Sequence, residues 1–397
     1  MKLLHLSNIA GKLGGGVSEV VHSLIQHQGK YDCKSNLWFI GSKKTKYEIH
    51  ENLNIELNRL NNINPIDFVN PLMYLKFYNL AKNYQIIHQH GVFMPTSLLS
   101  ILFNKKAKII ISPHGYLEPE KLKVSKVKKE LVLSVYEEKN LHSCHCLIAC
   151  SEQEGKALRD FGLTQPIAIL PNGIDSRILQ FKKESKSKSR FKEINKINED
   201  TKILLFLSRI HPFKGLKLLL ESIKCIEEDF VQNNWIFVIA GIDEQNHEGE
   251  LKRFVKKLNI GNIVKFVGPQ YKEDKINALD SSNCFILPSK GENFGIVVTE
   301  ALSRGLPVIT TKTTPWKHLE DNNCGWWVER NKESFISVIL ELFECSDGLI
   351  DKMGEQGREL VKDRYNWPKI SQQSVNIYKW VLSDFNEKFK KGFSLYD

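Results

Sequence analysis

Short apolar runs of strand length recur along the whole chain, and segments of helical period separate them. The runs are continuous rather than alternating, which is typical of strands that a parallel sheet buries on both faces. The predicted strands are Lys2–Leu6, Leu37–Ile40, Ile86–Gln89, Lys108–Ser112, Cys146–Cys150 and Ile167–Leu170 in the first half, and Ile203–Leu207, Trp235–Ala240, Ile263–Val267, Cys284–Leu287, Pro307–Thr310 and Gly325–Val328 in the second half.

The two halves begin alike, since Lys2-Leu-Leu-His-Leu-Ser and Lys202-Ile-Leu-Leu-Phe-Leu-Ser each lead into a turn and an amphipathic segment. Alternation of strands and helices in both halves predicts an α/β fold with two doubly wound domains in tandem. Between them, Phe181–Asp200 is rich in Lys, Ser and Glu and predicts a surface linker or a helical excursion. Ligands bind at the carboxyl ends of strands in such sheets, so we expect the chemistry there, in a cleft that the domains share.

The chain has 397 residues and a formal net charge of +10, from 56 Lys and Arg residues against 46 Asp and Glu residues. The positive excess favours an anionic partner, such as nucleic acid, a phosphorylated ligand or an anionic membrane surface. The first residues lack the apolar core of a secretory signal, and no run reaches the ~18–20 apolar residues of a membrane span. The eight cysteines lie largely in apolar runs, which favours reduced thiols in a cytoplasmic protein.

Two glutamates follow the predicted strand Cys284–Leu287. Glu292 lies in a glycine-containing loop, and Glu300 lies one to two turns into a helix that we expect to begin near Phe294–Ile296. The exposed N–H groups of such a helix start favour an anion, but two carboxylates beside it would repel phosphate. They suit sugar hydroxyls, because one carboxylate can accept two hydrogen bonds from a vicinal diol. For either glutamate alone, a solvated side chain is the alternative.

Two cations, Arg209 and Lys214, follow the first strand of the second half. Both can reach one pyrophosphate from this loop, where they would stabilise the negative charge of a departing nucleoside diphosphate. In the first half, the loop from Gly11 to Gly16 allows close backbone approach to a phosphate or a sugar. The Gly-x-Gly-x-x-Gly fingerprint is not completed, because Glu19 takes its last position, and no P-loop motif is present. NAD and P-loop nucleotide binding are therefore disfavoured.

Histidines end two predicted strands of the first half. His114 stands in Ser112-Pro-His-Gly-Tyr, and His88 and His90 form a second-rank pair in His88-Gln-His90. His114 is well placed to orient and recognise a sugar, with a structural histidine as the alternative. The segment His142–Cys150 suggests zinc, but no second pair of ligands stands at the required spacing, so we expect structural thiols and no metal site.

Together these segments resemble the retaining GT-B glycosyltransferases of family GT4, over most of the chain. The resemblance rests on Glu292-x7-Glu300, the glycine loop, the Pro-His-Gly segment, Pro171-Asn-Gly-Ile-Asp175 and Ser208-Arg-Ile-His-Pro-Phe-Lys214-Gly. It implies two Rossmann-like domains that face each other across a cleft. Residues 1–178 would bind the acceptor, residues 179–369 would bind the nucleotide sugar, and the C-terminal helix at about 370–397 would cross back to the first domain.

The resemblance also implies a role for each site residue. Glu292 would lie against the transferred sugar, Glu300 would grip the ribose, Arg209 and Lys214 would hold the diphosphate, His114 would lie beside the sugar, Gly15 and Gly16 would close over the pyrophosphate, and Asn293, Phe294 and Gly295 would add donor contacts. Glu292, His114, Arg209 and Lys214 form the expected catalytic set. The chain has no Asp-x-Asp element, which metal-dependent glycosyltransferases use, so we expect metal-independent transfer without a cofactor.

A basic amphipathic stretch runs from residue 121 to Leu141. Its lysines are Lys121, Lys123, Lys126, Lys128 and Lys129, and apolar residues alternate with them. Such a stretch is typical of a helix that binds an anionic membrane surface or an acceptor at that surface, and a solvated face is the alternative. Nucleic acid is disfavoured as a partner, because no RNA-binding or DNA-binding module is present.

The expected function is transfer of a hexose or N-acetylhexosamine, with retention, from a UDP-sugar, or next a GDP-sugar. The acceptor would be a lipid-linked oligosaccharide of O-antigen, capsule or lipopolysaccharide synthesis, and the protein would be peripheral at the cytoplasmic face of the bacterial inner membrane. The oligomeric state is not indicated. One alternative is a nucleotide-sugar epimerase of the same shape, which would form product without an acceptor. Another is a non-catalytic protein that binds sugar nucleotides.

Overall fold

The computed structural model describes residues 1–7, 15–41, 58–61, 75, 77–79, 81–94, 96–103, 106–174, 178, 185–389 and 392–397. The chain folds into two compact units, which are Met1–Gly173 with Trp367–Asp397 (unit 1) and Ile174–Asn366 (unit 2). Each boundary lies a few residues before the one expected at 178 or at 370. The chain returns to unit 1 with Trp367, whose indole lies against Gly173, where a Cβ atom would come within 2.5 Å of the ring.

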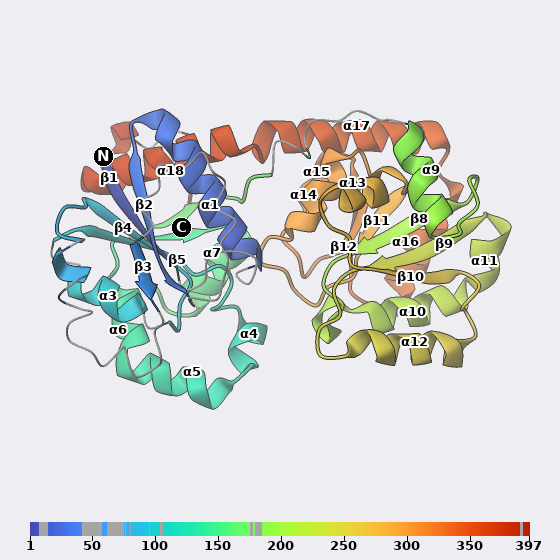
Figure 1. Ribbon diagram of the computed structural model, residues 1–397, viewed down its shortest axis with the longest axis horizontal. Helices are drawn as coiled ribbons and strands as arrows, with labels where there is room; N and C mark the ends of the chain where they lie inside the picture. The colour runs from blue at the N-terminus through green and yellow to red at the C-terminus, as the bar shows by residue number, and fades with distance from the viewer. Residues whose placement is uncertain are drawn as a thin grey trace. The chain divides into compact units, whose positions relative to one another are not determined.

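Unit 1 contains, within its described residues, an eight-stranded sheet in the order β14-β7-β6-β5-β4-β1-β2-β3 (Figure 1). Neighbouring strands are parallel, except that β14 runs antiparallel to β7. The strands are β1 Lys2–Ser7, β2 Lys34–Gly41, β3 Asn58–Asn61, β4 Ile86–His90, β5 Lys108–Ser112, β6 Cys146–Ala149, β7 Ile167–Ile169 and β14 Ser394–Tyr396.

Helices cover the sheet of unit 1. Helix α1 packs with α18, and α3 packs with α6 on the opposite face of the sheet (Figure 1). The helical elements are α1 Gly15–Gln28, η2 Gly29–Tyr31, α3 Thr96–Phe103, α4 Pro119–Lys123, α5 Lys126–Val132, the π-helical turn η4 Leu133–Glu137, α6 Glu138–Ser143, α7 Glu152–Asp160, α18 Trp367–Leu382 and η6 Glu387–Phe389.

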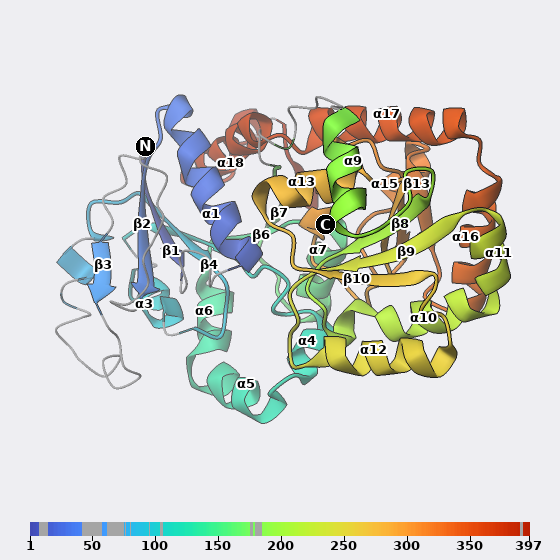
Figure 2. The ribbon, with the colours of Figure 1, turned by 45° about the vertical axis from the view of Figure 1, so that its right-hand side comes forward.

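In the part of unit 2 that the structure describes, six strands form a sheet in the order β10-β9-β8-β11-β12-β13, and neighbouring strands are all parallel. Helix α10 packs with α12 and α16, while α14 packs with α17 and α9 with α13 on the other face (Figures 1 and 2). The elements are β8 Lys202–Leu207, β9 Trp235–Ala240, β10 Val264–Gly268, β11 Cys284–Leu287, β12 Val308–Thr311, β13 Gly325–Val328, α9 Ser185–Ile194, η5 Pro212–Lys214, α10 Leu216–Cys225, α11 Glu227–Gln232, α12 His247–Leu258, α13 Lys272–Asp280, α14 Ile296–Ser303, α15 His318–Asp321, α16 Lys332–Glu344 and α17 Asp347–Arg364.

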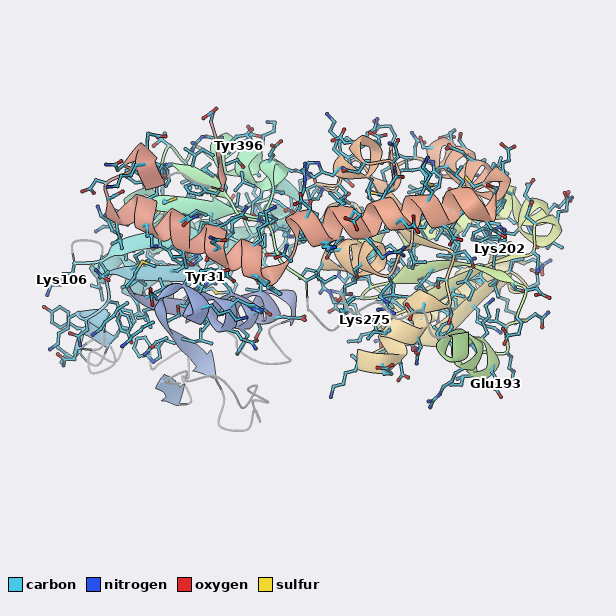
Figure 3. All side chains as sticks on the ribbon, turned by 90° about the horizontal axis from the view of Figure 1, so that it is seen from above. Tyr31, Lys106, Glu193, Lys202, Lys275 and Tyr396 are labelled. Carbon is cyan, nitrogen blue, oxygen red and sulfur yellow. The ribbon has the colours of Figure 1, made fainter. Side chains whose placement is uncertain are left out.

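The predicted fold class is confirmed, since both units are α/β layers built on parallel sheets. Strands such as β6 and β11 are buried along their whole length, which is why their apolar runs are continuous. Two short strands, β3 and β14, were not predicted. Tyr396 of β14, labelled in Figure 3, packs against Gly155 of α7, and β14 covers the outer edge of β7. No helix in the described part of the chain is both long and apolar enough to cross a bilayer.

The basic stretch from residue 121 to Leu141 is not one continuous helix as expected. Helix α4 ends at Lys123, Val124 after it has an extended backbone, and Ser125 has a φ of 54° in the left-handed region before α5 begins. A residue in this conformation cannot continue a right-handed helix, so the chain changes direction there.

Candidate active site

Glu292 and Lys214 meet at the carboxyl edge of the unit 2 sheet. Lys214 ends the turn η5 that follows β8, and Glu292 lies in the loop that follows β11. Strands β8 and β11 are parallel neighbours, so their loops emerge at the same edge. The Lys214 ammonium contacts Glu292 Oε1, and Ser289 Oγ donates to the same oxygen at 2.6 Å. The two charged side chains are only 10% and 13% exposed, so this ion pair is largely withdrawn from water.

Gly215 allows the two loops to approach. Its φ is 75°, and a Cβ atom there would lie 2.0 Å from the carbonyl oxygen of Pro288. Any other residue would push the β8 loop away from the β11 loop and separate Lys214 from Glu292. Glycine at this position is therefore what lets the two loops meet.

The residues between Glu292 and α14 form the expected helix start. Gly295 has a φ of 78° directly before Ile296, the first residue of α14. Phe294 is buried, its ring packs on Trp316 and Tyr365, and its carbonyl oxygen accepts a hydrogen bond from the Trp316 indole at 2.6 Å. A contact from Phe294 to a ligand would therefore come from its backbone. Asn293 stands next to it in the same loop.

Glu300 lies on α14 and has a lysine partner that the sequence analysis missed. Lys275 of α13 donates to Glu300 Oε1 at 2.5 Å, and the Glu300 side chain is 7% exposed. The helix α13 follows β10, so Lys275, labelled in Figure 3, belongs to a third strand–helix connection of the same sheet. Each of the two glutamates is thus paired with a lysine from another segment of unit 2.

Arg209 is largely exposed and forms a two-point contact with Glu244, in which its Nη1 lies 3.0 Å from each carboxylate oxygen. Glu244, which follows β9, was also missed. Burial is the main cause that lowers the pKa of His211, and the charges of Arg209 and Lys214 lower it further against the opposing charge of Glu244. Both cations therefore lie near His211, although each has its own carboxylate partner.

His114 follows β5 in unit 1 and has a φ of 54°, a left-handed conformation that is rare for a residue with a Cβ atom. Its turn is held by Glu154 of α7, whose carboxylate accepts hydrogen bonds from Gly115 N at 2.5 Å and from Cys150 N at 2.7 Å. Glu154 is fully buried, and burial raises its pKa. The carboxylate thus braces the end of β5 against the end of β6.

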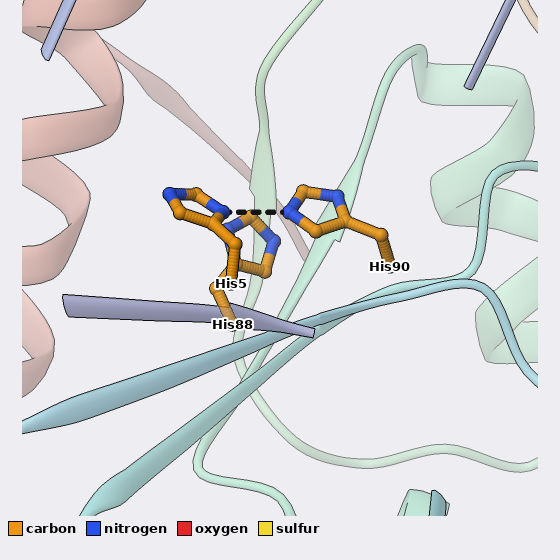
Figure 4. A group of neighbouring side chains, drawn as sticks. All are labelled: His5, His88 and His90. Carbon is orange, nitrogen blue, oxygen red and sulfur yellow. Dashed lines mark hydrogen bonds between the residues drawn. The ribbon is translucent and has the colours of Figure 1, made fainter. Parts of the chain in front are cut away.

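The histidines form a cluster in the interior of unit 1. The described residues contain a group of three buried histidines, His5, His88 and His90, whose nearest ring nitrogens all lie within 4.8 Å of one another (Figure 4). His5 was missed by the sequence analysis, although strand pairing sets it directly opposite His88. A pocket at this end of the sheet is lined in part by His88, His90, Ser112, His114, Asn172 and Trp367.

The remaining predicted site residues lie elsewhere on unit 1. Gly15 and Gly16 are the first two residues of α1, and the loop residues 8–14 before them lie outside the described part. The predicted basic surface is on α4 and α5, where Lys121, Lys123 and Lys126 pair with nearby glutamates. The eight cysteines are free thiols, and those at positions 144, 146 and 150 are buried.

Exposed apolar residues accompany the basic surface. Val124, Val127, Leu131 and Val135 are 63%, 81%, 64% and 69% exposed. We call the segment from residue 119 to residue 135 the α4–α5 surface. Its apolar exposure is unusual, because large apolar side chains are normally exposed singly.

Known proteins resemble the chain in both units. Residues 14–177 match Glycosyltransferase Family 4, and residues 187–360 match Glycosyl transferases group 1. An uncharacterized glycosyltransferase of Methanocaldococcus jannaschii is 23% identical over 256 residues, which cover 63% of this chain and 62% of that relative, so the chain spans less than two thirds of its length.

Two further matches cover a larger share of the similar protein. The UDP-Gal:alpha-D-GlcNAc-diphosphoundecaprenol alpha-1,3-galactosyltransferase of Escherichia coli is 25% identical over 328 residues, which cover 77% of this chain and 78% of that protein. The structure of Anabaena HepE in complex with UDP and glucose superposes with a TM-score of 0.73 at 17% identity, and the match covers 96% of this chain and 99% of that one. With both units matched by glycosyltransferase families and this architecture, the chain belongs to the GT-B glycosyltransferases.

Proposed function

We propose that the protein transfers a hexose or N-acetylhexosamine from a nucleoside diphosphate sugar to a lipid-linked saccharide, with retention at the anomeric carbon. A UDP-sugar is the preferred donor and a GDP-sugar is the next. The observation that supports this most directly is the pair of glutamate–lysine contacts in unit 2, Glu292 with Lys214 between two loops and Glu300 with Lys275 between two helices. Carboxylates there suit sugar and ribose hydroxyls, and cations suit the diphosphate between them.

In this proposal, Lys214 and Glu292 of unit 2 give up their contact with each other when the donor binds. Lys214 leaves Glu292 for the diphosphate, and Glu292 then accepts hydrogen bonds from hydroxyls of the transferred sugar. Arg209, held by an exposed pair of small energetic value, can turn to the same phosphates at little cost. As the glycosidic bond breaks, negative charge gathers on the leaving diphosphate, and cations already in place stabilise that state more than the bound donor.

The other donor contacts are assigned in the same way, with carboxylates on hydroxyl groups and cations on phosphates. Glu300 holds the ribose, and the loop residues Asn293 to Gly295 contact the donor through their backbone at the start of α14. The cations Arg209 and Lys214 supply the positive charge that a metal ion would otherwise bring, so transfer would be metal-independent. In unit 1, His114 recognises a sugar, and Gly15 and Gly16 approach the pyrophosphate.

The acceptor part of the proposal concerns unit 1. The name of the E. coli relative describes transfer onto a diphosphoundecaprenol-linked sugar, which is an acceptor embedded in a membrane. The α4–α5 surface combines exposed apolar side chains with Lys128 and Lys129, a composition that suits an anionic lipid surface. The protein would therefore work as a peripheral protein at the cytoplasmic face of the bacterial inner membrane, in the synthesis of a surface polysaccharide such as O-antigen, capsule or lipopolysaccharide.

Nucleotide binding provides the first test. In thermal unfolding with UDP, GDP, ADP and CMP, we expect UDP or GDP to raise the midpoint, because a ligand that binds only the folded state stabilises it. Lys214→Ala and Arg209→Ala should remove most of this shift, while Lys257→Ala, which removes an exposed lysine of α12, should retain it. No shift with any nucleotide would contradict the donor assignment.

Turnover provides the second test. The full-length protein is incubated with UDP-sugars, with and without a polyprenyl-diphosphate-linked saccharide, and products are separated by mass and by anomeric configuration. The proposal predicts a new α-linked saccharide only when the acceptor is present, and unchanged rates after treatment with EDTA. An epimerised sugar nucleotide without acceptor would instead identify an isomerase.

A further inference from the structure

A chain of buried polar side chains runs from the helices of unit 1 to the pocket beside His114. Ser374 lies on α18, Gln28 ends α1, His5 lies on β1, His90 ends β4 and His114 follows β5. Their contacts join end to end, from Gln28 to His5 at 3.1 Å, from His5 to His90 at 2.8 Å and from His90 to His114 at 3.0 Å. Each of these hydrogen bonds contains one proton, and a neutral imidazole has only one proton to donate. The donor side of one hydrogen bond therefore determines the donor side of the next.

The orientation of the Gln28 amide sets the direction at the inner end. Ser374 Oγ donates its proton to the carbonyl oxygen of Ser371 at 2.7 Å, so it accepts from Gln28 Nε2 at 2.9 Å. On the other side of the amide, Ser35 Oγ donates to Gln28 Oε1 at 2.9 Å. The amide nitrogen therefore faces α18, and the amide oxygen, which can only accept, faces His5.

Because the Gln28 oxygen can only accept, it determines the tautomers of His5, His90 and His114 in turn. His5 must donate to Gln28 Oε1 from Nε2, so a neutral His5 has a bare Nδ1 that accepts from His90 Nε2. His90 then has a bare Nδ1, which accepts from His114 Nε2. His114 in turn carries its one proton on Nε2, and its Nδ1 is the nitrogen with a free lone pair.

Burial supports the neutral state that this reasoning needs. Burial lowers the pKa of His5 and of His114 to about 4, and it lowers the pKa of His88 and His90 well below the usual range. The nearby ammonium of Lys121 lowers the pKa of His114 further. At neutral pH each ring therefore has one proton, as the hydrogen-bond chain requires.

We propose that Gln28, His5 and His90 are positioning residues that hold His114 in its Nε2–H tautomer, so that Nδ1 accepts a hydrogen bond from a sugar hydroxyl in the pocket. The inference rests on the proposed function for the identity of the ligand. His114 lines the pocket with Nε2 already bound to His90, so Nδ1 is the ring nitrogen available to a ligand there. Glu154 holds the turn that places the ring.

A metal ion at His5, His88 and His90 is a less suitable occupant of this cluster. Tyr378 and Ser112 already engage the two nitrogens of His88, at 2.9 and 2.8 Å. His5 Nδ1 and His90 Nε2 share a proton at 2.8 Å, whereas two imidazoles on one zinc, each about 2.0–2.1 Å from the ion, would both have to present lone pairs. The hydrogen bonds use the atoms that a metal would need.

Nitrogen-15 spectroscopy of the imidazoles tests the proposal directly. In the full chain labelled at histidine, long-range proton–nitrogen correlations distinguish a protonated ring nitrogen from a bare one. We expect a bare Nδ1 and a protonated Nε2 for His5, His90 and His114 at neutral pH. A protonated Nδ1 on His114 would overturn the proposal, as would one equivalent of Zn²⁺ shifting His5, His88 and His90 together.

A variant pair tests whether Gln28 is the cause. Gln28→Leu removes the acceptor that orients His5, so the chain can reverse and the Nδ1 of His114 should become partly protonated. Transfer should then slow roughly five- to tenfold, the size of one neutral hydrogen bond, with little change in the KM for the donor. Gln26→Leu, the same substitution at an exposed position of α1, should change neither the spectrum nor the rate.

These readouts separate the inference from the proposed function. If the wild-type tautomers are as stated but no nucleotide sugar is turned over, the function is wrong and the hydrogen-bond chain remains. If transfer proceeds normally while His114 carries its proton on Nδ1, the inference is wrong and the function remains. Should Gln28→Leu fail to fold, the wild-type spectrum alone still decides the tautomer.

Discussion

At the scale of single residues, the contact between Lys214 and Glu292 adds little to stability, and the proposed function gives it another role. Both side chains are largely buried, and removing two charges from water costs about as much as their attraction returns. Such a pair is therefore weak evidence for a stabilising interaction. In the proposed function, the pair holds an ammonium and a carboxylate at one place, where a bound donor would separate them and contact each.

A double-mutant cycle tests this view of the pair. Lys214→Met or Glu292→Gln alone should lower the free energy of unfolding by about 1–3 kcal/mol, because each leaves a partly buried charge without its partner. The double variant should be at least as stable as either single variant. Urea unfolding measures the three values, and all three variants should lose transfer activity. Additive losses of stability would contradict this account.

At the scale of elements, β14 and α7 show how a chain end can be held by one close contact. Gly155 lies inside α7, and a Cβ atom there would lie 2.7 Å from the ring of Tyr396 in β14. Glycine inside a helix costs about 1 kcal/mol relative to alanine, so the close approach of the ring explains the glycine. The strand β14 in turn covers an edge that would otherwise expose unpaired backbone groups of β7.

The effect of Gly155→Ala on the free energy of unfolding should change sign when Tyr396 is replaced. In the full chain we expect the substitution to destabilise unit 1 by about 1–3 kcal/mol, because the added methyl displaces the Tyr396 ring. In a Tyr396→Ala background the same substitution should stabilise the protein by up to about 1 kcal/mol. Thermal unfolding measures both effects, and Gly29→Ala, which meets no atom within 4 Å, serves as the control. The same sign in both backgrounds would refute the explanation.

The α4–α5 surface leads to a prediction about membranes. We expect the protein to sediment with vesicles that contain anionic lipid and much less with neutral vesicles, because both lysines and apolar side chains contribute. Val127→Asp and Leu131→Asp should each weaken binding at least fivefold, since burial of one such side chain is worth about 1.5–3 kcal/mol. Val231→Asp, which changes an exposed valine of α11, should bind as the wild type does. Equal binding by all three variants would assign the membrane contact elsewhere.

At the scale of the whole molecule, the proposed donor contacts concentrate in unit 2. Arg209, Lys214, Glu292 and Glu300 all lie there, and the loops after β8 and β11 carry three of the four. Unit 1 carries the histidine chain and the α4–α5 surface. Under the proposals above, unit 2 would supply charged groups to the nucleotide and unit 1 would supply neutral hydrogen-bond acceptors to a sugar.

Hydrogen exchange on the full chain tests this division. Saturating UDP should slow amide exchange most strongly in residues 208–215 and 288–303, because binding lowers the fraction of molecules in which these segments open. Exchange in β5 and β6 of unit 1 should stay unchanged, and EDTA should not alter the result. Lys214→Met should abolish the protection at the same UDP concentration. Protection confined to unit 1 would contradict the assignment of donor binding to unit 2.

Much of the fold could be predicted from the sequence, because strands buried on both faces are mostly apolar along their length. The strands β5, β9, β11 and β13 have the predicted limits. Helix α14 begins within the predicted range for the same kind of local reason, since Gly295 before it needs a left-handed backbone. In contrast, β14 has three residues and no pattern of its own, and it is a strand only because β7 offers an edge to it.

The sequence by itself therefore determined the parallel α/β layers and which loops carry charged and glycine residues, since both follow from local patterns. Only the tertiary structure decided which groups meet. Lys275 and Glu300 come together from two helices, Arg209 and Glu244 from two loops, and His5 and His90 from two strands. Coulomb attraction and hydrogen bonding act over a few ångströms, so the partner of each group depends on the order and register of the strands.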